Sequence, residues 1–181
     1  MAEQLMTYDN SGRPLGLKDR AFVHANGDLH KTVQCWVVDS RRNVLVQRRA
    51  KHKQGTPGKW DVSCGGHCEG METPEQTVQR EAAEELGLPI KPESLHFLGV
   101  AQRISQGGKN REIVYLYLYE TEFSPQKLVY QAEEIDALKT LTLAELKISY
   151  ETGDPDFAER DGAFQSLFRY FKVPFRPQPS V

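Results

Sequence analysis

The sequence lacks the features that mark membrane-spanning, secreted or disulfide-stabilised proteins. No run of about 20 apolar residues is present that could span a bilayer. The first ten residues, MAEQLMTYDN, contain neither the basic nor the apolar segment of a secretory signal. Cysteine is scarce, and three cysteines in 181 residues do not form the even set that predicts a disulfide framework. We therefore expect a cytoplasmic protein without a membrane partner.

Neither sign of charge is in large excess, because 23 lysine and arginine residues nearly balance 25 aspartate and glutamate residues. A formal net charge of −2 gives no electrostatic reason to expect binding to a nucleic acid polymer. The composition, 39% hydrophobic and 27% charged, is typical of a globular chain without repeats. We expect one domain over residues 1–181 and a small molecule as its partner.

The order of strand-forming, helix-forming and turn-forming segments predicts an α/β protein. We expect strands over residues 4–9, 31–39, 43–49, 60–64, 95–104, 112–120 and 137–141. We expect helices over residues 19–23, 74–86, 143–147 and 156–171. Residues 1–30 then form a strand and helix that extend the domain at its N-terminus, and the proline-rich tail at 174–181 is expected to fray. Tyrosines 115, 117 and 119 share one face of their strand, where packing in the sheet is a more frequent role than stacking on a ligand.

The stretch from Gly66 to Leu88, GHCEGMETPEQTVQREAAEELGL, organises the rest of the chain. Thr73 and the glutamine three residues later form a capping box that predicts a helix start, and Gly87 predicts its end. Three apolar residues recur at every fourth position and form a stripe that should lie on a core: Val78, Ala82 and Leu86.

A second stripe on this helix is acidic and consists of Glu81, Glu84 and Glu85. At about 100° per residue, the three carboxylates share one patch in the C-terminal half of the helix, where the helix dipole disfavours anions. A solvated acidic face is the ordinary explanation of such a run. A divalent cation with a preference for oxygen ligands would offset the charge, and the carbonyl of Gly65 could add a ligand because glycine permits close backbone approach.

Nine positions of the stretch resemble the Nudix box, GX5EX7REUXEEXGU, where U is an aliphatic or small apolar residue. The matching residues are Gly66, Glu72, Arg80, Glu81, Ala82, Glu84, Glu85, Gly87 and Leu88. The resemblance implies a Nudix α/β/α sandwich with a mixed β-sheet, in which the box forms a loop, a helix and a second loop. It also implies that the Arg-Glu-x-x-Glu-Glu face binds Mg²⁺ or Mn²⁺ and cleaves a small-molecule diphosphate linked to another moiety.

The mechanism that we expect is attack of a metal-activated water on a phosphorus atom of the diphosphate. Glu85 is our first choice of metal ligand and Glu81 the second, with Glu84 in the same patch. Arg80 is expected to orient Glu81 or Glu84 by a bidentate ion pair. The choice of general base varies across the resemblance, and four carboxylates stay candidates: Glu81, Glu84, Glu112 and Glu134.

A longer stretch, from His24 to His67, is similar to isopentenyl diphosphate isomerases, a branch of the Nudix superfamily, and contains LVQRRAKHKQGTPGKWDVSCGGH. In these isomerases histidines bind a metal, and His30 and His67 match their positions, with His24 approximately placed. Arg49 and Lys53 match residues that hold the substrate diphosphate. Both lie in a basic cluster just before the strand that leads into the acidic helix, which also favours binding of phosphate. We therefore expect substrate binding by these two basic residues and by the two matching histidines.

Glu112 matches the catalytic glutamate of the isomerases, but two positions depart from their pattern. Gly65 stands where the isomerases carry a catalytic thiol, and Cys64 is its neighbour. Adjacent strand residues point to opposite faces, so Cys64 could replace the thiol only after a slip in register. Asn110 stands where the isomerases carry a further metal-binding glutamate. Because the acidic box is complete, we expect hydrolysis within an isomerase-like subgroup.

Three alternatives remain at this stage. The chain could be an isomerase that acts on isopentenyl diphosphate through Cys64 or a histidine site. It could be a Nudix-like domain that binds a diphosphate without catalysis, although such a domain would not need the box carboxylates. A zinc site formed by Cys64, His67 and Cys68 lacks the paired spacing of zinc modules, and buried or idle thiols are more frequent.

Overall fold

The computed structural model describes residues 3–53, 55–158 and 162–176. Its strands are β1 (Gln4–Tyr8), β2 (Pro14–Asp19), β3 (Leu29–Val38), β4 (Asn43–Arg49), β5 (Trp60–Asp61), β6 (Cys64–His67), β7 (Leu95–Ser105), β8 (Asn110–Glu120) and β9 (Ile135–Thr142). Its α-helices are α1 (Arg20–Asn26), α2 (Pro74–Leu86), α3 (Leu143–Thr152) and α4 (Gly162–Tyr170). Short 3-10 helices lie at Pro92–Ser94, Gln106–Gly108 and Pro125–Lys127.

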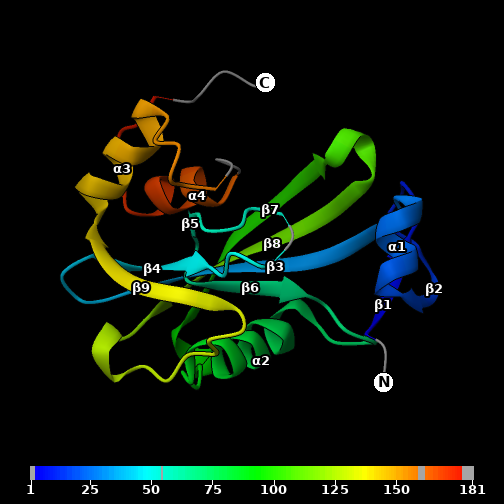
Figure 1. The fold of residues 1–181 in the computed structure, drawn as a ribbon, viewed down its shortest axis with the longest axis horizontal. Coiled ribbons are helices and arrows are strands. Elements are labelled where there is room, and N and C mark those ends of the chain that lie inside the picture. Colours follow the sequence, from blue (N-terminus) through cyan, green and yellow to red (C-terminus); the bar gives the residue numbers. More distant parts are fainter. Residues whose placement is uncertain (1–2, 54, 159–161, 177–181) are drawn as a thin grey trace.

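Helices cover both faces of one mixed sheet (Figure 1). Helix α2 lies on one face, whereas α3 and α4 lie on the other, and α1 sits at the end of the sheet beside β1 and β2. This arrangement confirms the α/β/α sandwich with a mixed sheet that the sequence predicts. None of the helices in the described ranges is both long and apolar enough to cross a membrane.

Strand β3 is the centre of the sheet. It pairs in parallel with β8 along its whole length, from Leu29 opposite Arg111 to Val38 opposite Glu120. Its residues from position 33 to 38 are almost all apolar and buried, as expected for a strand that is covered on both faces. Gln34 interrupts this apolar run, although it is also buried.

The sheet forks beside β3. Strand β4 pairs with β3 only at Val37 and Val38, and then it continues alone to pair with β5 and β9. Strand β6 takes its place and pairs with β3 from Thr32 to Cys35. The space between the two branches lies next to α2, and the candidate site occupies it.

Helix α2 confirms the predicted start and end of the box helix. The Thr73 side chain accepts a hydrogen bond from the N–H of Gln76, whose side chain accepts one from the N–H of Thr73. Gly87 ends the helix in the left-handed conformation, with φ of 60°. The three residues of the predicted apolar stripe are fully buried against the sheet: Val78, Ala82 and Leu86.

Aromatic side chains fill the core on the opposite face of the sheet. Trp36 packs edge-on against Phe164 of α4, and its indole N–H donates to the carbonyl oxygen of Ala163 at 3.0 Å. The tyrosine stripe of β8 lies on the α2 side, where Tyr117 and Tyr119 are buried. The stripe therefore serves the packing of the sheet, as the sequence favours.

Two predicted elements differ clearly from the structure. The strand predicted over 60–64 is two strands, β5 and β6, because the Gly65-Gly66 pair is itself part of the sheet. The helix predicted over 156–171 begins only at Gly162, since Phe157 forms a β-bridge with Trp60. Residues 159–161 of that prediction, residues 1–2 of the predicted N-terminal extension and residues 177–181 of the predicted frayed tail lie outside the described residues.

Candidate active site

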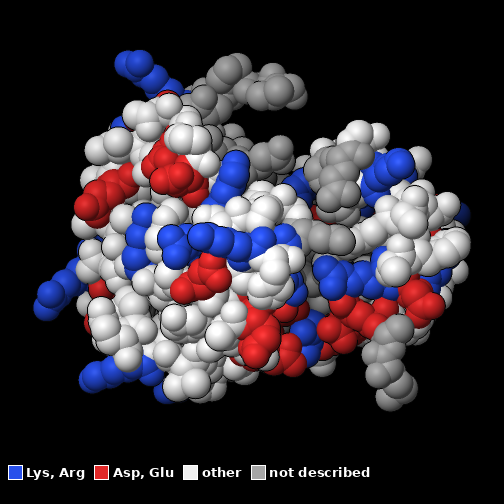
Figure 2. Space-filling model, viewed as in Figure 1, with Lys and Arg blue, Asp and Glu red and all other residues white. Residues whose placement is uncertain are grey.

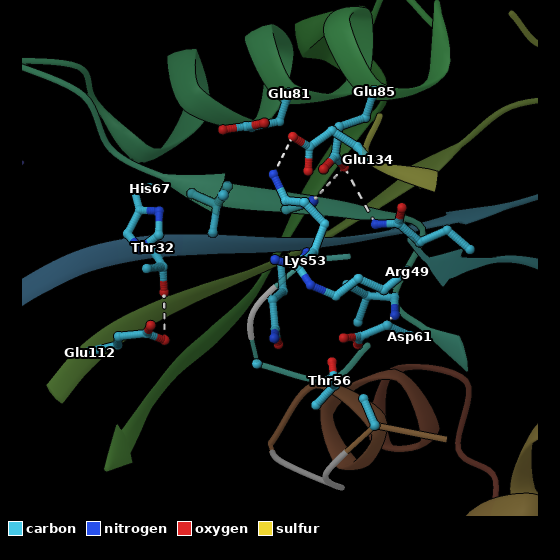
Figure 3. A pocket seen from close by; sticks show the side chains of 18 of the residues that line it. Thr32, Arg49, Lys53, Thr56, Asp61, His67, Glu81, Glu85, Glu112 and Glu134 are labelled. Carbon is cyan, nitrogen blue, oxygen red and sulfur yellow. Dashed lines mark hydrogen bonds and ion pairs between the residues drawn. The ribbon is translucent and has the colours of Figure 1, made fainter. Parts of the chain in front are cut away.

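A cavity of about 680 Å³ opens at the fork of the sheet. Its walls come from α1, α2 and strands β3 to β8, and from the loops before β5 and β9 (Figure 3). The described residues that line it include eight carboxylates and six lysine or arginine side chains. When every one of these carboxyls is ionised, the lining carries an excess of two negative charges, so a diphosphate would be repelled unless it arrived with cations. On the molecular surface, a band of acidic side chains crosses the lower middle of the face shown in Figure 2, with basic side chains above it.

The two glycines of β6 let the acidic helix approach the sheet. The N–H of Gly65 donates to Oε2 of Glu85 at 3.2 Å. A Cβ atom added to Gly66 would lie 2.0 Å from Oε1 of Glu81, and one added to Gly65 would lie 2.5 Å from the carbonyl oxygen of Val33. Contacts this short are not found for real Cβ atoms, so both positions require glycine.

The three box carboxylates differ in burial. Glu85 is only 5% exposed, the side chain of Glu81 is 13% exposed, and that of Glu84 is 50% exposed. Burial is the main cause that raises the pKa of Glu81 to about 7. Burial and the neighbouring charge of Glu81 raise the pKa of Glu85 to about 8. Without a cation, both carboxyls therefore hold a proton for part of the time at neutral pH.

Arg80 connects the box residues into one network. Its Nε and Nη2 donate to the two carboxylate oxygens of Glu72 at 2.8 and 3.1 Å, which is a bidentate pair. Its Nη1 donates to Glu81 at 2.9 Å and to Glu84 at 3.0 Å, and Nη2 also donates to the carbonyl oxygen of His67 at 2.9 Å. The bidentate partner is thus Glu72, whereas the sequence favours Glu81 or Glu84 for that role. Arg80 holds both of these acids by single hydrogen bonds.

Arg49 and Lys53, which the sequence predicts to bind phosphate, line the same end of the cavity as Glu85 (Figure 3). Lys53 Nζ lies 2.5 Å from Oε1 of Glu134, a carboxylate of the loop before β9. Glu134 is close enough for its charge to raise the pKa of Glu85, while the charge of Arg49 acts in the opposite direction. Acidic and basic groups therefore share one small volume at this end.

Three histidines meet at the other end of the cavity. The ligand nitrogens of His24, His30 and His67 all lie within 4.8 Å of one another. His30 Nδ1 donates to the carbonyl oxygen of Asp28 at 2.9 Å, which leaves Nε2 of the neutral ring as an acceptor. That buried Nε2 atom has no hydrogen-bond partner in the described structure. His67 Nδ1 lies 3.5 Å from Glu3, and this contact orients its Nε2, which lies 3.2 Å from Nε2 of His24.

Burial favours the neutral form of the three histidines, because it is the largest cause that lowers the pKa of each ring. Neutral imidazole is the form that binds metals such as Zn²⁺. The orphaned nitrogen of His30 and the oriented ring of His67 thus fit a transition metal. His24, which the sequence places only approximately, completes this cluster.

Glu112 is 3% exposed and lies beside the histidines. Arg103 contacts its Oε2 through Nε at 2.8 Å and through Nη2 at 2.5 Å. Asn110 donates to Oε1 at 2.7 Å, and Thr32 donates to Oε2 at 3.5 Å. Nε2 of His30 is 3.9 Å from Oε1. Both oxygens of this carboxylate are therefore engaged by protein donors.

The cysteines lie apart from the cavity wall. Cys64 faces Cys35 across the pairing of β3 and β6, and both are completely buried in the core beneath α2. No slip in register has moved Cys64 onto the cavity side, where the backbone of Gly65 lies instead. Within the described ranges the only convergent group of potential metal ligands is the histidine cluster, so Cys64, His67 and Cys68 do not form a zinc site.

The structure brings most of the predicted site residues to one cavity. It is lined by Arg49, Lys53, Gly65, His67, Arg80, Glu81, Glu84, Glu85 and Glu112, and His30 lies behind His67. Sequence reasoning misses Gln34, Gln47 and Arg103, which also line it. The polar Gln34 inside an apolar strand is a signal that could have been noticed, whereas the sequence around Arg103 offers none.

The carboxylate patch fits a divalent cation that prefers oxygen ligands. Glu81 and Glu85 lie beside the backbone of Gly66 and Gly65, and Glu84 is the more exposed third acid of the patch. The pKa of Glu85, the most buried of the three, is raised, and a cation would lower it. Gln47 donates to Oε2 of Glu85 at 3.4 Å, which fixes the orientation of this carboxylate. Glu81, Glu84 and Glu85 would hold the cation.

A model of the NUDIX domain family matches residues 28–161 of the sequence. The chain belongs to the Nudix family. It is 34% identical over 149 residues to an uncharacterised Nudix hydrolase of Clostridium acetobutylicum, and the match covers 80% of this chain and 72% of that protein. It is also 34% identical over 90 residues to the isopentenyl-diphosphate Delta-isomerase of Saccharopolyspora erythraea, with coverage of 49% of this chain and 46% of the isomerase.

Solved structures support the same fold. The crystal structure of DR0079 from Deinococcus radiodurans superimposes with a TM-score of 0.71 at 20% sequence identity, covering 92% of this chain and 98% of that one. Nudix enzymes generally use divalent metal ions, and the family membership supports a pyrophosphohydrolase. The resemblance to the Nudix box and to its isomerase-like branch is thereby confirmed.

Proposed function

We propose that this Nudix protein is a hydrolase that requires Mg²⁺ or Mn²⁺ and cleaves a diphosphate linked to another moiety, with residues 1–181 acting as one domain. The observation that carries the proposal is the nearly complete burial of Glu85 beside Glu81 in a cavity where carboxyl groups outnumber lysine and arginine side chains. Such an arrangement is unfavourable unless positive charge is added, and a divalent cation supplies it in the smallest volume.

In this proposal Glu81, Glu84 and Glu85 hold the cation, with the carbonyl of Gly65 as a further ligand. The cation would neutralise the diphosphate and polarise its phosphoryl oxygens. Arg80 keeps Glu81 and Glu84 in place through the hydrogen bonds described above. The bidentate pair with Glu72 fixes Arg80 itself, so the network of hydrogen bonds does not depend on bound substrate.

Arg49 and Lys53 bind the phosphate groups, and His67, with His30 packed behind it, borders the other end of the substrate. Water attacks one phosphorus atom, the P–O–P bond breaks, and the bridging oxygen leaves with the departing phosphate. The products are two phosphate species, and one proton is released to solvent or to a general base.

We propose Glu81, Glu84 and Glu134 as candidates for the general base, because each lines the cavity near Arg49 and Lys53 or next to Arg80. Glu112 is a poorer candidate since protein donors engage both of its oxygens. We give Glu112 the role of positioning the histidine end of the site.

The proposal is tested by release of phosphate from a panel of diphosphates with Mg²⁺ and with EDTA. We expect turnover only with the metal, and we expect Glu85→Gln to lower kcat by about 100-fold or more with the fold intact. Near-normal turnover of this variant would contradict its role. A complete lack of Mg²⁺-dependent turnover on every diphosphate would instead favour a non-catalytic domain that binds diphosphate.

The histidine cluster favours a second candidate, an isomerase that acts on isopentenyl diphosphate. Against it, Cys64 points into the core, and Arg103 neutralises the glutamate that would act there. Incubation with isopentenyl diphosphate separates the two candidates, because an allylic isomer indicates isomerisation and free phosphate indicates hydrolysis. Cys64→Ala should leave hydrolysis unchanged, whereas an isomerase that depends on this thiol would lose its activity.

A further inference from the structure

The cavity carries a set of groups to which the proposed hydrolysis assigns no contact with the substrate. They are neutral side chains that can form hydrogen bonds: Thr32, Gln34, Gln47, Thr56, Asn110 and Gln131. Two of their amides contain a buried oxygen that lacks a hydrogen-bond partner in the described structure, namely Oε1 of Gln34 and Oδ1 of Asn110. A buried acceptor without a donor costs free energy, and a ligand that donates to it recovers that cost.

Gln34 lines the cavity from the central strand β3. It is 7% exposed, and in the pairing of β3 with β6 it stands opposite Gly65, whose N–H donates to Glu85. Because Gly65 has no side chain, nothing on that strand covers the Gln34 amide from the neighbouring position. The Gln34 side chain therefore lines the same cavity as Glu85, Arg49 and Lys53.

Asn110 lies farther along the same cavity, beside Glu112 and the histidines. Its Nδ2 donates to Glu112 at 2.7 Å, which fixes the amide and leaves Oδ1 without a donor. The two acceptors thus sit on different strands, β3 and β8, which run in parallel. A ligand that satisfies both must carry hydroxyl or amino groups at more than one position.

Large aromatic side chains lie elsewhere in the fold. Tyr117 and Tyr119 are buried beneath α2, Trp36 is in the core beneath α4, and Trp60 faces Arg48 and Lys139. The aromatic rings among the described lining residues are those of two histidines, and none of the residues outside the described ranges is aromatic. A nucleobase would find no ring larger than imidazole to stack on, and a prenyl chain would cover the unpaired amide oxygens with hydrocarbon.

We propose that the moiety linked to the diphosphate is polyhydroxylated and not aromatic, such as a sugar or another polyol, and that Gln34 accepts a hydrogen bond from one of its hydroxyl groups. The inference rests on the proposed hydrolase function and adds the class of substrate. A volume of about 680 Å³ is ample for a phosphorylated pentose with its cation.

The first experiment compares 5-phosphoribosyl 1-diphosphate, ADP and isopentenyl diphosphate as substrates of the full chain with Mg²⁺, by phosphate release. We expect kcat/KM for the sugar diphosphate to exceed the other two by about 10-fold or more. A preference for ADP or isopentenyl diphosphate overturns the inference and leaves the hydrolase intact. If the protein hydrolyses none of the three compounds and does not hydrolyse inorganic diphosphate either, the result contradicts the proposed hydrolase function itself.

The second experiment tests Gln34 with Gln34→Leu, which keeps the bulk of the side chain and removes the acceptor. We expect kcat/KM for the sugar diphosphate to fall about 10-fold, and to fall by clearly more than kcat/KM for inorganic diphosphate, which has no carbon hydroxyl. Gln102→Leu, on the exposed side of β7, is the matched control and should change neither value. An equal loss on both substrates would assign Gln34 a structural role and refute its contact with the substrate.

The stability of the variant gives an independent readout. Because leucine removes a buried acceptor that has no partner, Gln34→Leu should keep or raise Tm. Addition of the sugar diphosphate with Mg²⁺ should raise Tm of the wild type more than that of the variant. Equal increases would show that Gln34 does not contact the ligand.

Discussion

Replacement of Glu85 by glutamine should stabilise the metal-free protein even though it removes the proposed metal ligand. Glu85 is 5% exposed, and burial together with the charge of Glu81 raises its pKa from 4.5 to about 8. An ionised Glu85 therefore costs free energy in the folded chain that the unfolded chain does not incur. Glutamine has nearly the same shape and carries no charge.

The size of the effect follows from the two pKa values. Their difference corresponds to about 5 kcal/mol when the folded group is fully ionised, and to about 4 kcal/mol at pH 7.5, where part of the folded population binds a proton. Glutamine keeps an acceptor for the N–H of Gly65, but its NH₂ group must fit beside the amide of Gln47. We therefore expect Glu85→Gln to raise the free energy of unfolding by about 2 kcal/mol, less than the full electrostatic gain.

The assay is urea unfolding at pH 7.5 in EDTA, followed by tryptophan fluorescence, and repeated with Mg²⁺. Magnesium should stabilise the wild type and leave Glu85→Gln unchanged, because only the wild type retains the buried ligand. Glu84→Gln is the matched control. Its side chain is 50% exposed, so its change in EDTA should stay within about 0.5 kcal/mol.

Two results would refute this reasoning. A lower unfolding free energy of Glu85→Gln in EDTA would show that the buried carboxylate is not a source of destabilisation. Equal stabilisation of the wild type and Glu85→Gln by Mg²⁺ would place the cation away from this carboxylate.

Three further predictions concern the same patch. Gly66→Ala should lower kcat by about 10-fold or more, because its Cβ would displace the Glu81 carboxylate 2.0 Å away, and steady-state kinetics over a range of Mg²⁺ concentrations would measure the loss. In EDTA, the free energy of unfolding should rise as the pH falls from about 9 to about 5. The reason is that the pKa values of Glu81 and Glu85 are about 7 and about 8 in the folded chain and about 4.5 in the unfolded chain. A urea midpoint that does not change with pH would contradict this prediction. Arg80→Lys should destabilise the protein by about 1–3 kcal/mol at pH 7.5, because lysine cannot form the bidentate pair with Glu72, and thermal or urea unfolding with a constant m-value would check it.

The sequence predicts the box helix in detail because its signals are local. The capping box at Thr73, the glycine at position 87 and the apolar stripe each involve residues within one or two helical turns, and each appears in the structure as expected. The strand predicted over residues 43–49 likewise has the same first and last residues as β4 in the structure. Local chemistry was sufficient for these elements.

Local sequence patterns do not show how distant segments of the chain pair and pack. The fork between β4 and β6 depends on which strand pairs with each part of β3, and two glycines next to a predicted loop gave no sign that they would join the sheet. The ion pair between Arg103 and Glu112 also joins two strands, and nothing near position 103 indicates it. His24 could be placed only approximately by its resemblance, and its place in the cluster depends on α1 packing beside β1 and β2.

The N-terminal segment forms part of the wall of the active site. Glu3 lines the cavity, lies 3.5 Å from Nδ1 of His67 and pairs with Arg20 at 3.0 Å. A change at Glu3 would therefore remove a group that orients His67 and holds Arg20 at the mouth of the cavity. A kinetic effect of such a change would report on the wall of the active site and not only on the edge of the sheet.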